Sequence, residues 1–455
     1  MNIELPNGMS RRQFITAGAA ASAWLAMSKT GLAQAAAKIA PSDQLNVAIV
    51  GCGDQGRVLI NACLKIPYVK FRAVCDIWPY AQRYSSRYLG KFGHETAVYS
   101  DYREMLEKEK GIDAVICASP DWMHSPITCA ALEAGKHVYC EKLMSNTIEG
   151  AKQMVLTQRK TGKLLQIGHQ RRSNPRYLHA KNRLIDEEKL LGRIMTASGQ
   201  WHKAKSDDRT CAKTYEMDEA TLKKYGYENM QQFMNWRWYK KYGGGPICDL
   251  GAHQIDMFTW FLSADPKAVM ASGGVDYFKG HDWYDNVICI FEYDTKDGVA
   301  RAMYDVLTTT SSMGYLEKYL GVEGSMVISE IPRWNQCFRE KAISPSTEPK
   351  WVSLGEKGLI KRVEDAAAKV EEKKNTEVDA RLAASPPPET WEIPIVLDKA
   401  IHQPHLENFF EAIQKGTKLH CPAEVGYRST VAVLKVNEAV AAQKRLEFKP
   451  EEYKI

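Results

Sequence analysis

Three glycines and one aspartate have the residue types and the spacing of a dinucleotide-binding turn. The apolar run 45–50 leads directly into Gly51, Gly53 and Gly56, in the pattern G-x-G-x-x-G. A helix-like segment and a second apolar run follow, and Asp76 stands twenty residues after the last glycine. Such glycines allow a tight turn, close approach of a pyrophosphate and close packing of helix against strand. Asp76 can accept hydrogen bonds from ribose hydroxyls and would repel a 2′-phosphate, so the pattern favours NAD over NADP.

Lys142, Asp249 and His253 have the chemistry that oxidation of a secondary alcohol needs. His253 suits the base that takes the hydroxyl proton, because imidazole titrates near neutral pH. Asp249 precedes it by four residues, a spacing that puts both side chains on one face of a helix. Asp249 could orient the imidazole, contact a substrate hydroxyl, or both, and Lys142 could steady a developing alkoxide and relay the proton. Taken singly, Asp249 could instead be a helix N-cap and His253 a buried structural histidine.

The elements that must position these residues change character near residue 168. Before it, apolar runs alternate with amphipathic segments, which predicts a parallel sheet covered by helices on both faces. The expected strands are 45–50, 70–75, 114–118, 137–140 and 164–168, and the expected helices include 79–92, 125–134 and 147–161. Asn146, with Glu149 three residues later, is the expected cap of the last helix. Ligands in such sheets bind beyond the carboxyl ends of the strands, where 119–121 and 141–142 follow.

Strand-like runs dominate after residue 168, which predicts a second, α+β domain with a largely antiparallel, open-faced sheet. The expected strands are 193–201, 267–273, 286–293, 299–307 and 326–329, and two helices are expected at 405–415 and 424–443. Residues 330–400 look like an irregular insertion that contains a charged helix at 361–384. The expected fold class is therefore α/β, with a Rossmann domain at 44–168 and a substrate and oligomerisation domain at 169–455.

Three separated motifs resemble the Gfo/Idh/MocA oxidoreductases. Residues 135–142, GKHVYCEK, resemble the family's GKHVxxEKP segment, and residues 119–124, SPDWMH, are similar to its TPNxxH turn. Residues 243–253, GGGPICDLGAH, resemble its GGGxxxDxGxH segment. The resemblance implies NAD chemistry on sugars or polyols. It also implies dinucleotide contacts from Gly51, Gly53, Asp54, Gln55, Gly56, Asp76, Ser119, Pro120, His124, Glu141 and Lys142.

Leu143 departs from the family pattern, because it stands where the family has a proline that is commonly cis. Either a non-proline cis bond is present or the loop differs. The resemblance also implies that the segment after Gly168 lines the sugar site. Arg171 and Tyr177 could then offer donors to hydroxyls, while Trp236 and Trp238 could stack on sugar C–H surfaces. Each group could equally be structural.

The N-terminal 35 residues are expected to be a twin-arginine export signal rather than part of the fold. Arg11 and Arg12 precede a short, weakly apolar run, and Ala33-Gln-Ala35 offers a cleavage site. This route moves folded proteins, so an exported NAD protein is expected to reach the periplasm with its cofactor tightly held. The hydrophobic content of 44% and charged content of 25% are those of an ordinary globular protein, without a basic block for nucleic acid. Neither the eleven cysteines nor His202 and His281 show the spacing of a metal site.

Three functions remain open from the sequence. The favoured one is oxidation of a secondary hydroxyl, at C3 of a sugar or glycoside, by hydride transfer to NAD in a homo-oligomer without a membrane anchor. The second is a redox-neutral glycosidase that oxidises, eliminates, hydrates and reduces again, with an acid or base from Tyr177, His202 or Tyr215. The third is a non-catalytic sugar-binding protein on a dinucleotide fold.

Overall fold

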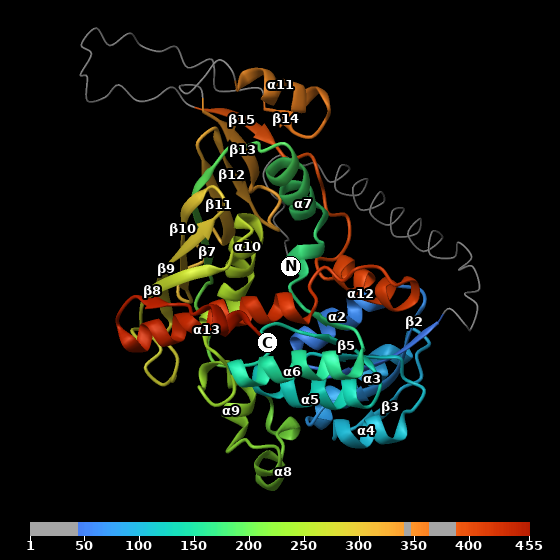
Figure 1. Ribbon diagram of the computed structural model, residues 1–455. Coiled ribbons are helices and arrows are strands. Elements are labelled where there is room, and N and C mark those ends of the chain that lie inside the picture. Colours follow the sequence, from blue (N-terminus) through green and yellow to red (C-terminus); the bar gives the residue numbers. More distant parts are fainter. Residues whose placement is uncertain (1–43, 341–346, 364–387) are drawn as a thin grey trace, which may run out of the picture. The chain divides into compact units, whose positions relative to one another are not determined.

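The first half of the chain folds around a six-stranded parallel sheet. The computed structural model describes residues 44–340, 347–363 and 388–455, and the expected export signal lies outside these residues. The strand order is β3-β2-β1-β4-β5-β6 (Figure 1). The strands are β1 Leu45–Val50, β2 Val69–Cys75, β3 Ala97–Tyr99, β4 Ala114–Cys117, β5 His137–Cys140 and β6 Leu165–Ile167. All neighbouring pairs are parallel, so their carboxyl ends lie along one edge.

Helices connect these strands and cover the sheet. They are α2 Asp54–Cys63, α3 Pro79–Gly90, α4 Tyr102–Lys108, α5 Asp121–Glu133 and α6 Ile148–Thr161. The expected cap of α6 was wrong by one residue, because the side chain of Thr147, not Asn146, accepts a hydrogen bond from the backbone N–H of Gly150. Helix α5 begins at Asp121, four residues earlier than expected, because Pro120 is extended and lets the helix start directly after the β4 turn.

The second half contains a ten-stranded sheet in the order β14-β15-β13-β12-β11-β7-β10-β9-β8-β16. Its strands are β7 Ile194–His202, β8 Pro266–Gly274, β9 Asn286–Thr295, β10 Gly298–Leu307, β11 Tyr315–Gly321, β12 Gly324–Ile328, β13 Asn335–Arg339, β14 Lys361–Arg362, β15 Glu389–Glu392 and β16 Leu446–Glu447. Only β7 and β10 pair in parallel. The predicted fold class, a Rossmann domain followed by a largely antiparallel sheet, is confirmed.

The prediction for the region after residue 330 was partly wrong. Strands β13 and β15 extend the second sheet there, and helix α11 (Glu348–Glu356) packs Trp351 into the core. The start of the expected charged helix is strand β14 instead, and residues 364–384 of that helix lie outside the described residues. Strand pairing over a long sequence distance outweighed the local helix propensity at Lys361.

Four helical stretches of the second half position the site. Their bounds are α7 Pro175–Leu178, α10 Ala252–Leu262, α12 Gln403–Lys415 and α13 Ala423–Ala442. Short helices α8 Glu219–Lys224 and α9 Met230–Met234 lie in the segment between β7 and α10. Helix α13 contacts α6, α10 and β8, so it connects the two sheets (Figure 1).

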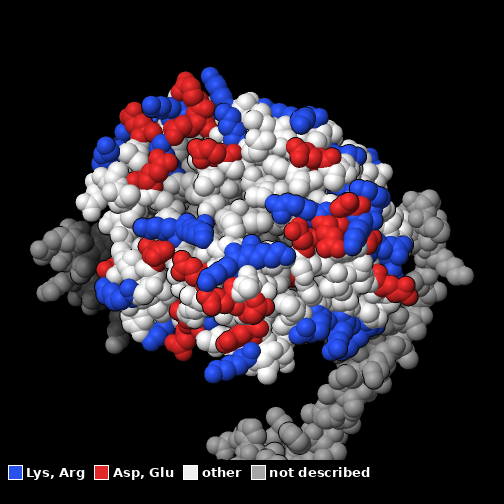
Figure 2. All heavy atoms as spheres, turned by 90° about the horizontal axis from the view of Figure 1, so that it is seen from below, with Lys and Arg blue, Asp and Glu red and all other residues white. Residues whose placement is uncertain are grey.

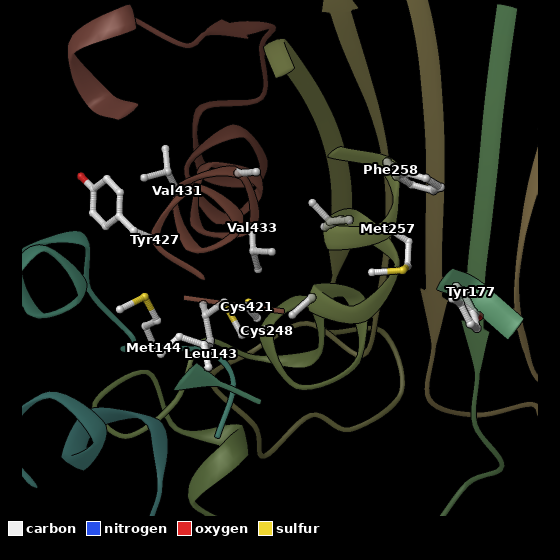
Figure 3. Packing of buried hydrophobic residues seen from close by; sticks show 14 of the residues in the cluster. Leu143, Met144, Tyr177, Cys248, Met257, Phe258, Cys421, Tyr427, Val431 and Val433 are labelled. Atoms are coloured by element: carbon white, nitrogen blue, oxygen red, sulfur yellow. The ribbon is translucent and has the colours of Figure 1, made fainter. Parts of the chain in front are cut away.

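One hydrophobic cluster extends under the expected site. Leu143 and Met144 directly follow Lys142 and belong to the same cluster as Cys248 and Val433 (Figure 3). Leu143 is fully buried there, and the Lys142–Leu143 peptide bond is cis. Of the two alternatives expected for this loop, the structure therefore has the non-proline cis bond.

The described surface carries both signs of charge. On the face in Figure 2, Lys and Arg side chains alternate with Asp and Glu side chains over most of the area. In the described part of the chain, no helix is both long and apolar enough to cross a membrane.

Candidate active site

The glycine turn leaves room where a dinucleotide phosphate would lie. Gly51 has φ +91°, and a Cβ there would come within 2.5 Å of the backbone of Ala118. A Cβ on Gly56 would come within 2.1 Å of the carbonyl oxygen of Gly51, whereas one on Gly53 would point into open space. Gly53 also caps α2 without a side-chain hydrogen bond. The turn therefore fits a pyrophosphate, with the free N–H groups of α2 facing the space beside Gly53.

Asp76 lies at the end of β2 and lines the same space. Its Oδ2 accepts a hydrogen bond from the Cys52 N–H at 2.6 Å, and its Oδ1 accepts one from the Trp78 N–H at 2.8 Å. Burial raises the pKa of Asp76, while these two backbone donors favour the ionised form. Since a carboxylate has about four acceptor positions, it can still accept from ribose hydroxyls.

One cavity of about 580 Å³ joins this turn to the expected catalytic residues. Lys142, Asp249 and His253 all line it. Of the expected dinucleotide contacts, it is lined by Gly51, Gly53, Asp54, Gln55, Asp76, Ser119, Pro120, His124, Glu141 and Lys142, while Gly56 packs behind the turn. Residues more than a hundred positions apart in the sequence thus meet at one edge of the parallel sheet.

Lys142 and Arg237 hold Asp249 between them. The Lys142 ammonium donates to the backbone oxygen of Asp249 and lies 4.0 Å from its Oδ1. Arg237 Nε donates to the same Oδ1 at 2.9 Å. Burial alone would raise the pKa of Asp249, but Arg237 and Lys142 outweigh burial and hold this pKa well below its ordinary value. Asp249 is therefore ionised and fixes the Lys142 ammonium.

Asp249 does not orient the imidazole of His253, which was one of the expected roles. Asp249 lies in a π-helical turn (Ile247–Gly251) that precedes α10, and the 3.6-residue repeat behind the expected alignment does not hold across that turn. Its carboxylate is directed to Arg237 and Lys142 instead.

His253 is buried at the start of α10, with 8% of its surface exposed, and faces the cavity. Burial is the larger cause that lowers the pKa of His253 well below its ordinary value, and the charge of Lys142 lowers it further. Its ring stacks on Trp201 at 5.5 Å, and its Nδ1 has no hydrogen-bond partner among the described residues. The ring is therefore neutral at neutral pH and can accept a proton.

Three of the four expected sugar contacts do not line the cavity in the described structure. Arg171 and Tyr177 are buried and both bind Glu317, with Tyr177 Oη 2.6 Å from Glu317 Oε2. Burial raises the pKa of Glu317 to about 7, although Arg171 opposes the shift. Trp238 stacks on His281 at 4.6 Å instead. Of these four residues only Trp236 reaches the cavity, because the basic turn after Gly168 folds inward to pair with carboxylates of the second sheet.

Another part of the cavity is lined by residues that sequence reasoning missed, and we call it the sugar end after the substrate proposed below. They are Gln170, Trp201, Arg237, Tyr315, Glu330 and His402. Tyr315 opens a strand that was not expected, and Glu330 follows β12 at the start of the presumed insertion. The three expected acid or base candidates of a glycosidase, Tyr177, His202 and Tyr215, are absent from this lining in the described chain.

His124 connects two loops of the site. Its Nε2 lies 2.7 Å from the carbonyl oxygen of Ser119, and its Nδ1 lies 2.6 Å from that of Leu143. Cys117 and Cys140 offer sulfur atoms within 4.8 Å of this ring. Because both ring nitrogens already face carbonyl oxygens, His124 positions the Ser119 turn and the loop that carries Lys142.

A segment of the second half reaches over the nucleotide end. Trp78 Nε1 donates to the Tyr215 carbonyl at 2.6 Å, and the tilted rings of Tyr80 and Tyr215 are in contact, with their centres 4.5 Å apart. Arg209 pairs with Asp54 in the first turn of α2. We call residues 209–227 the strap, since they join the Rossmann half across the cavity.

Two family models match consecutive parts of the chain. Residues 45–169 match an oxidoreductase family with an NAD-binding Rossmann fold, and residues 180–314 match the GFO/IDH/MocA C-terminal domain. Inositol 2-dehydrogenase of Salmonella typhimurium is 28% identical over 230 residues, 50% of this chain and 56% of that protein. A glycosyl hydrolase family 109 protein of Stenotrophomonas maltophilia is 31% identical over 160 residues, 34% of each. The chain thus spans between about a third and little more than half of the length of the curated relatives it matches.

A solved structure of levoglucosan dehydrogenase in complex with NADH has the same fold. It superimposes with a TM-score of 0.65 at 20% identity, over 89% of this chain and 99% of that one. The structural match, the two family models and the cavity at the glycine turn all agree on one family of proteins. The chain belongs to the Gfo/Idh/MocA family of oxidoreductases, and its first domain is an NAD-binding Rossmann domain.

Proposed function

We propose that this protein oxidises a secondary hydroxyl, at C3 of a sugar or glycoside, by hydride transfer to tightly bound NAD. One observation carries the proposal: Lys142, Asp249 and His253 line the same cavity as the glycine turn and Asp76. When bound, NAD supplies the hydride acceptor, at C4 of its nicotinamide. Its pyrophosphate would be held by the α2 N-terminus and its ribose by Asp76.

The chain's own residues would manage the proton and the charge. Neutral His253 accepts the proton of the reacting hydroxyl. The ammonium of Lys142 stabilises the negative charge that develops on the oxygen. Asp249 keeps that ammonium in place, and its second carboxylate oxygen can accept a neighbouring hydroxyl. The names of the relatives, an inositol dehydrogenase and a levoglucosan dehydrogenase, support a polyhydroxylated substrate.

The strap supports a cofactor that stays bound between turnovers. Its contacts with Trp78, Tyr80 and Asp54 would have to open for a dinucleotide to leave. Tight binding agrees with our proposal that residues 1–35 direct folded export to the periplasm, since NAD is made in the cytoplasm.

The test of this function is the spectrum and mass analysis of the purified protein, followed by addition of glycosides. We expect a co-purifying nicotinamide dinucleotide and the appearance of reduced-nicotinamide absorbance with a substrate. A protein that binds no nicotinamide nucleotide would contradict the proposal. A protein that binds NAD but leaves every sugar unchanged would favour the non-catalytic alternative.

A second candidate is the redox-neutral glycosidase. It is favoured by the similarity to a glycosyl hydrolase family 109 protein and by the contacts of the strap with the nucleotide end. A ketone at C3 would acidify the C2 proton and prepare the glycosidic bond for elimination. Product stoichiometry separates the two functions: the glycosidase releases free sugar and leaves NAD oxidised, whereas the dehydrogenase yields a keto sugar and reduced cofactor.

We also propose that the open face of the second sheet binds a second copy of the chain. Apolar side chains on this face are exposed in register across β8, β9 and β10, where Met270 and Met303 both pair with Ile290. Ile288 beside them is 55% exposed. Light scattering after size-exclusion chromatography should give a dimer or tetramer, and Ile288→Lys should shift it toward monomer.

A further inference from the structure

Glu330 is a buried acidic group on the wall of the sugar end. It follows β12, lines the cavity, and its side chain is only 3% exposed. Arg171 Nε donates to its Oε2 at 3.0 Å, and Gln170 Nε2 donates to its Oε1 at 3.3 Å. Each carboxylate oxygen keeps a free acceptor position. Glu330 is therefore held rigidly and can still accept hydrogen bonds from a molecule in the cavity.

The neighbours of Glu330 do not cancel its charge. Its one guanidinium partner, Arg171, is shared with Glu317, which is completely buried. Gln170 adds a second acceptor, because its Oε1 is buried without a partner among the described residues. Among the described residues, this wall therefore offers acceptors to a ligand, while the cation beside it, Arg171, is already paired with two carboxylates.

An aromatic stack joins this wall to the reactive end. Trp201 stacks on His253 at 5.5 Å and on Tyr315 at 4.3 Å. The guanidinium of Arg171 lies 5.5 Å from the Tyr315 ring centre. Arg171, Tyr315 and Trp201 thus link Glu330 to His253, and both ends of this link line the same cavity.

We propose that Glu330, with Gln170 beside it, selects the substrate by accepting a hydrogen bond from a hydroxyl or ammonium group remote from the reacting carbon. The inference rests on the proposed function and narrows its substrate class to neutral sugars and amino sugars. We expect a uronic acid with its carboxylate at this wall to bind poorly, because two carboxylates would face each other with Arg171 already bound to Glu330 and Glu317.

The test measures binding without turnover. Calorimetry is carried out on the full-length protein loaded with NADH, which cannot accept a hydride. The probes are methyl glycosides of the gluco, galacto and manno series, each as the neutral sugar, the amino sugar and the uronate. We expect the wild type to bind at least one neutral or amino sugar about a hundredfold more tightly than its matched uronate.

The decisive variant is Glu330→Gln, which keeps the shape and removes the charge. It should reduce the preference over the uronate at least tenfold, with NADH affinity unchanged. Glu323→Gln is the matched control, because Glu323 binds Lys350 at the other end of β12, away from the cavity. If Glu330→Gln does not fold, Gln170→Glu adds charge to the same wall and should increase the preference over the uronate.

The outcomes separate this inference from the proposed function. In one outcome Glu330→Gln binds sugars with the wild-type preference over the uronate, or Gln170→Glu does so where only that variant folds. Either result overturns the role of Glu330 and leaves the proposed function standing. Equal affinity of the wild type for the uronates and the neutral sugars also overturns the role of Glu330 and leaves the proposed function standing. A wild type that binds no member of any series overturns both.

Discussion

The two ends of the cavity are built in different ways. The nucleotide end comes from consecutive strand ends of one parallel sheet, with Gly51, Asp76 and Ser119 following β1, β2 and β4. The sugar end is assembled from β7 and β11, which pair over a long sequence distance, and from the turn after β12, a strand that follows β11 in a hairpin. Local motifs therefore define the nucleotide end, whereas tertiary pairing defines the sugar end. Mutations should separate the two ends, because those at the first should affect cofactor binding and those at the second should affect chemistry or substrate choice.

The largest effect should come from His253→Ala. Loss of the proton acceptor should lower kcat by about 10²- to 10⁴-fold, as measured by the rate of cofactor reduction under single-turnover conditions. Dinucleotide affinity, measured by calorimetry on the apoprotein, should change less than about threefold, because His253 lies at the sugar end. Full activity in this variant would assign the base to another group.

Lys142→Met should have the next largest effect. Removing the ammonium leaves the developing alkoxide without its positive charge, which should lower kcat by about 10²- to 10³-fold. The matched change Lys152→Met, on the exposed side of α6, should leave kcat unchanged. Equal losses in both variants would contradict a specific role for Lys142.

At the nucleotide end, Gly51→Ala should abolish dinucleotide binding and lower the free energy of unfolding by roughly 2–4 kcal/mol. The cause is the positive φ together with the clash against Ala118. Gly53→Ala is the matched control, because its Cβ would meet open space. It should leave the apoprotein as stable as the wild type and weaken dinucleotide binding alone. A Gly53→Ala variant that binds the dinucleotide as tightly as the wild type would show that the space beside Gly53 is not the phosphate site.

The buried histidines between the two ends should make stability depend on pH. Burial lowers the pKa of His169 to about 4 and that of His405 to about 3, from an ordinary 6.5. The unfolded chain takes up these protons first, so stability should fall as the pH drops below 6.5. Each histidine should lower the free energy of unfolding by about 2–3 kcal/mol at pH 4.5. His405→Gln should flatten this slope in urea denaturation, and an unchanged slope would mean that His405 is protonated in the folded state.

The smallest effect should come from the strap. Tyr215→Ala removes the ring contact with Tyr80, which contributes about 0.5–1.5 kcal/mol. Release of NAD should therefore become about three- to tenfold faster. The rate is measured in a chase with a nicotinamide analogue. Arg209→Ala should change the rate less than threefold, because the Arg209–Asp54 pair is more than half exposed. Equal release rates in Tyr215→Ala and the wild type would show that the strap does not retain the cofactor.

The contrast between the two ends also explains what the sequence could predict. The glycine turn, Asp76, Lys142, Asp249 and His253 stand in motifs with fixed spacing next to apolar runs. The placement of the glycine turn, Asp76 and Lys142 at one sheet edge follows from the parallel topology, whereas Asp249 and His253 come from the second half.

The sugar wall could not be predicted in the same way. Arg171 stands in a segment with the composition of a solvated turn. It is nevertheless buried, because Glu317 on β11 offers a carboxylate 146 residues away. Glu330 carries no local signal, since the hairpin of β11 and β12 is joined to β7 by a pairing over a long sequence distance. The cap of α6 and the π-helical turn before α10 depend on geometry that residue types alone do not specify.

The most direct test of the central claim is a crystal structure of the full chain with oxidised NAD and a sugar that it oxidises slowly or not at all. We predict that the nicotinamide C4 lies about 3.5 Å from a sugar carbon whose hydroxyl hydrogen-bonds Lys142 or His253. A nicotinamide ring that points away from both side chains, or a dinucleotide bound outside the cavity beside Gly53, would contradict the account.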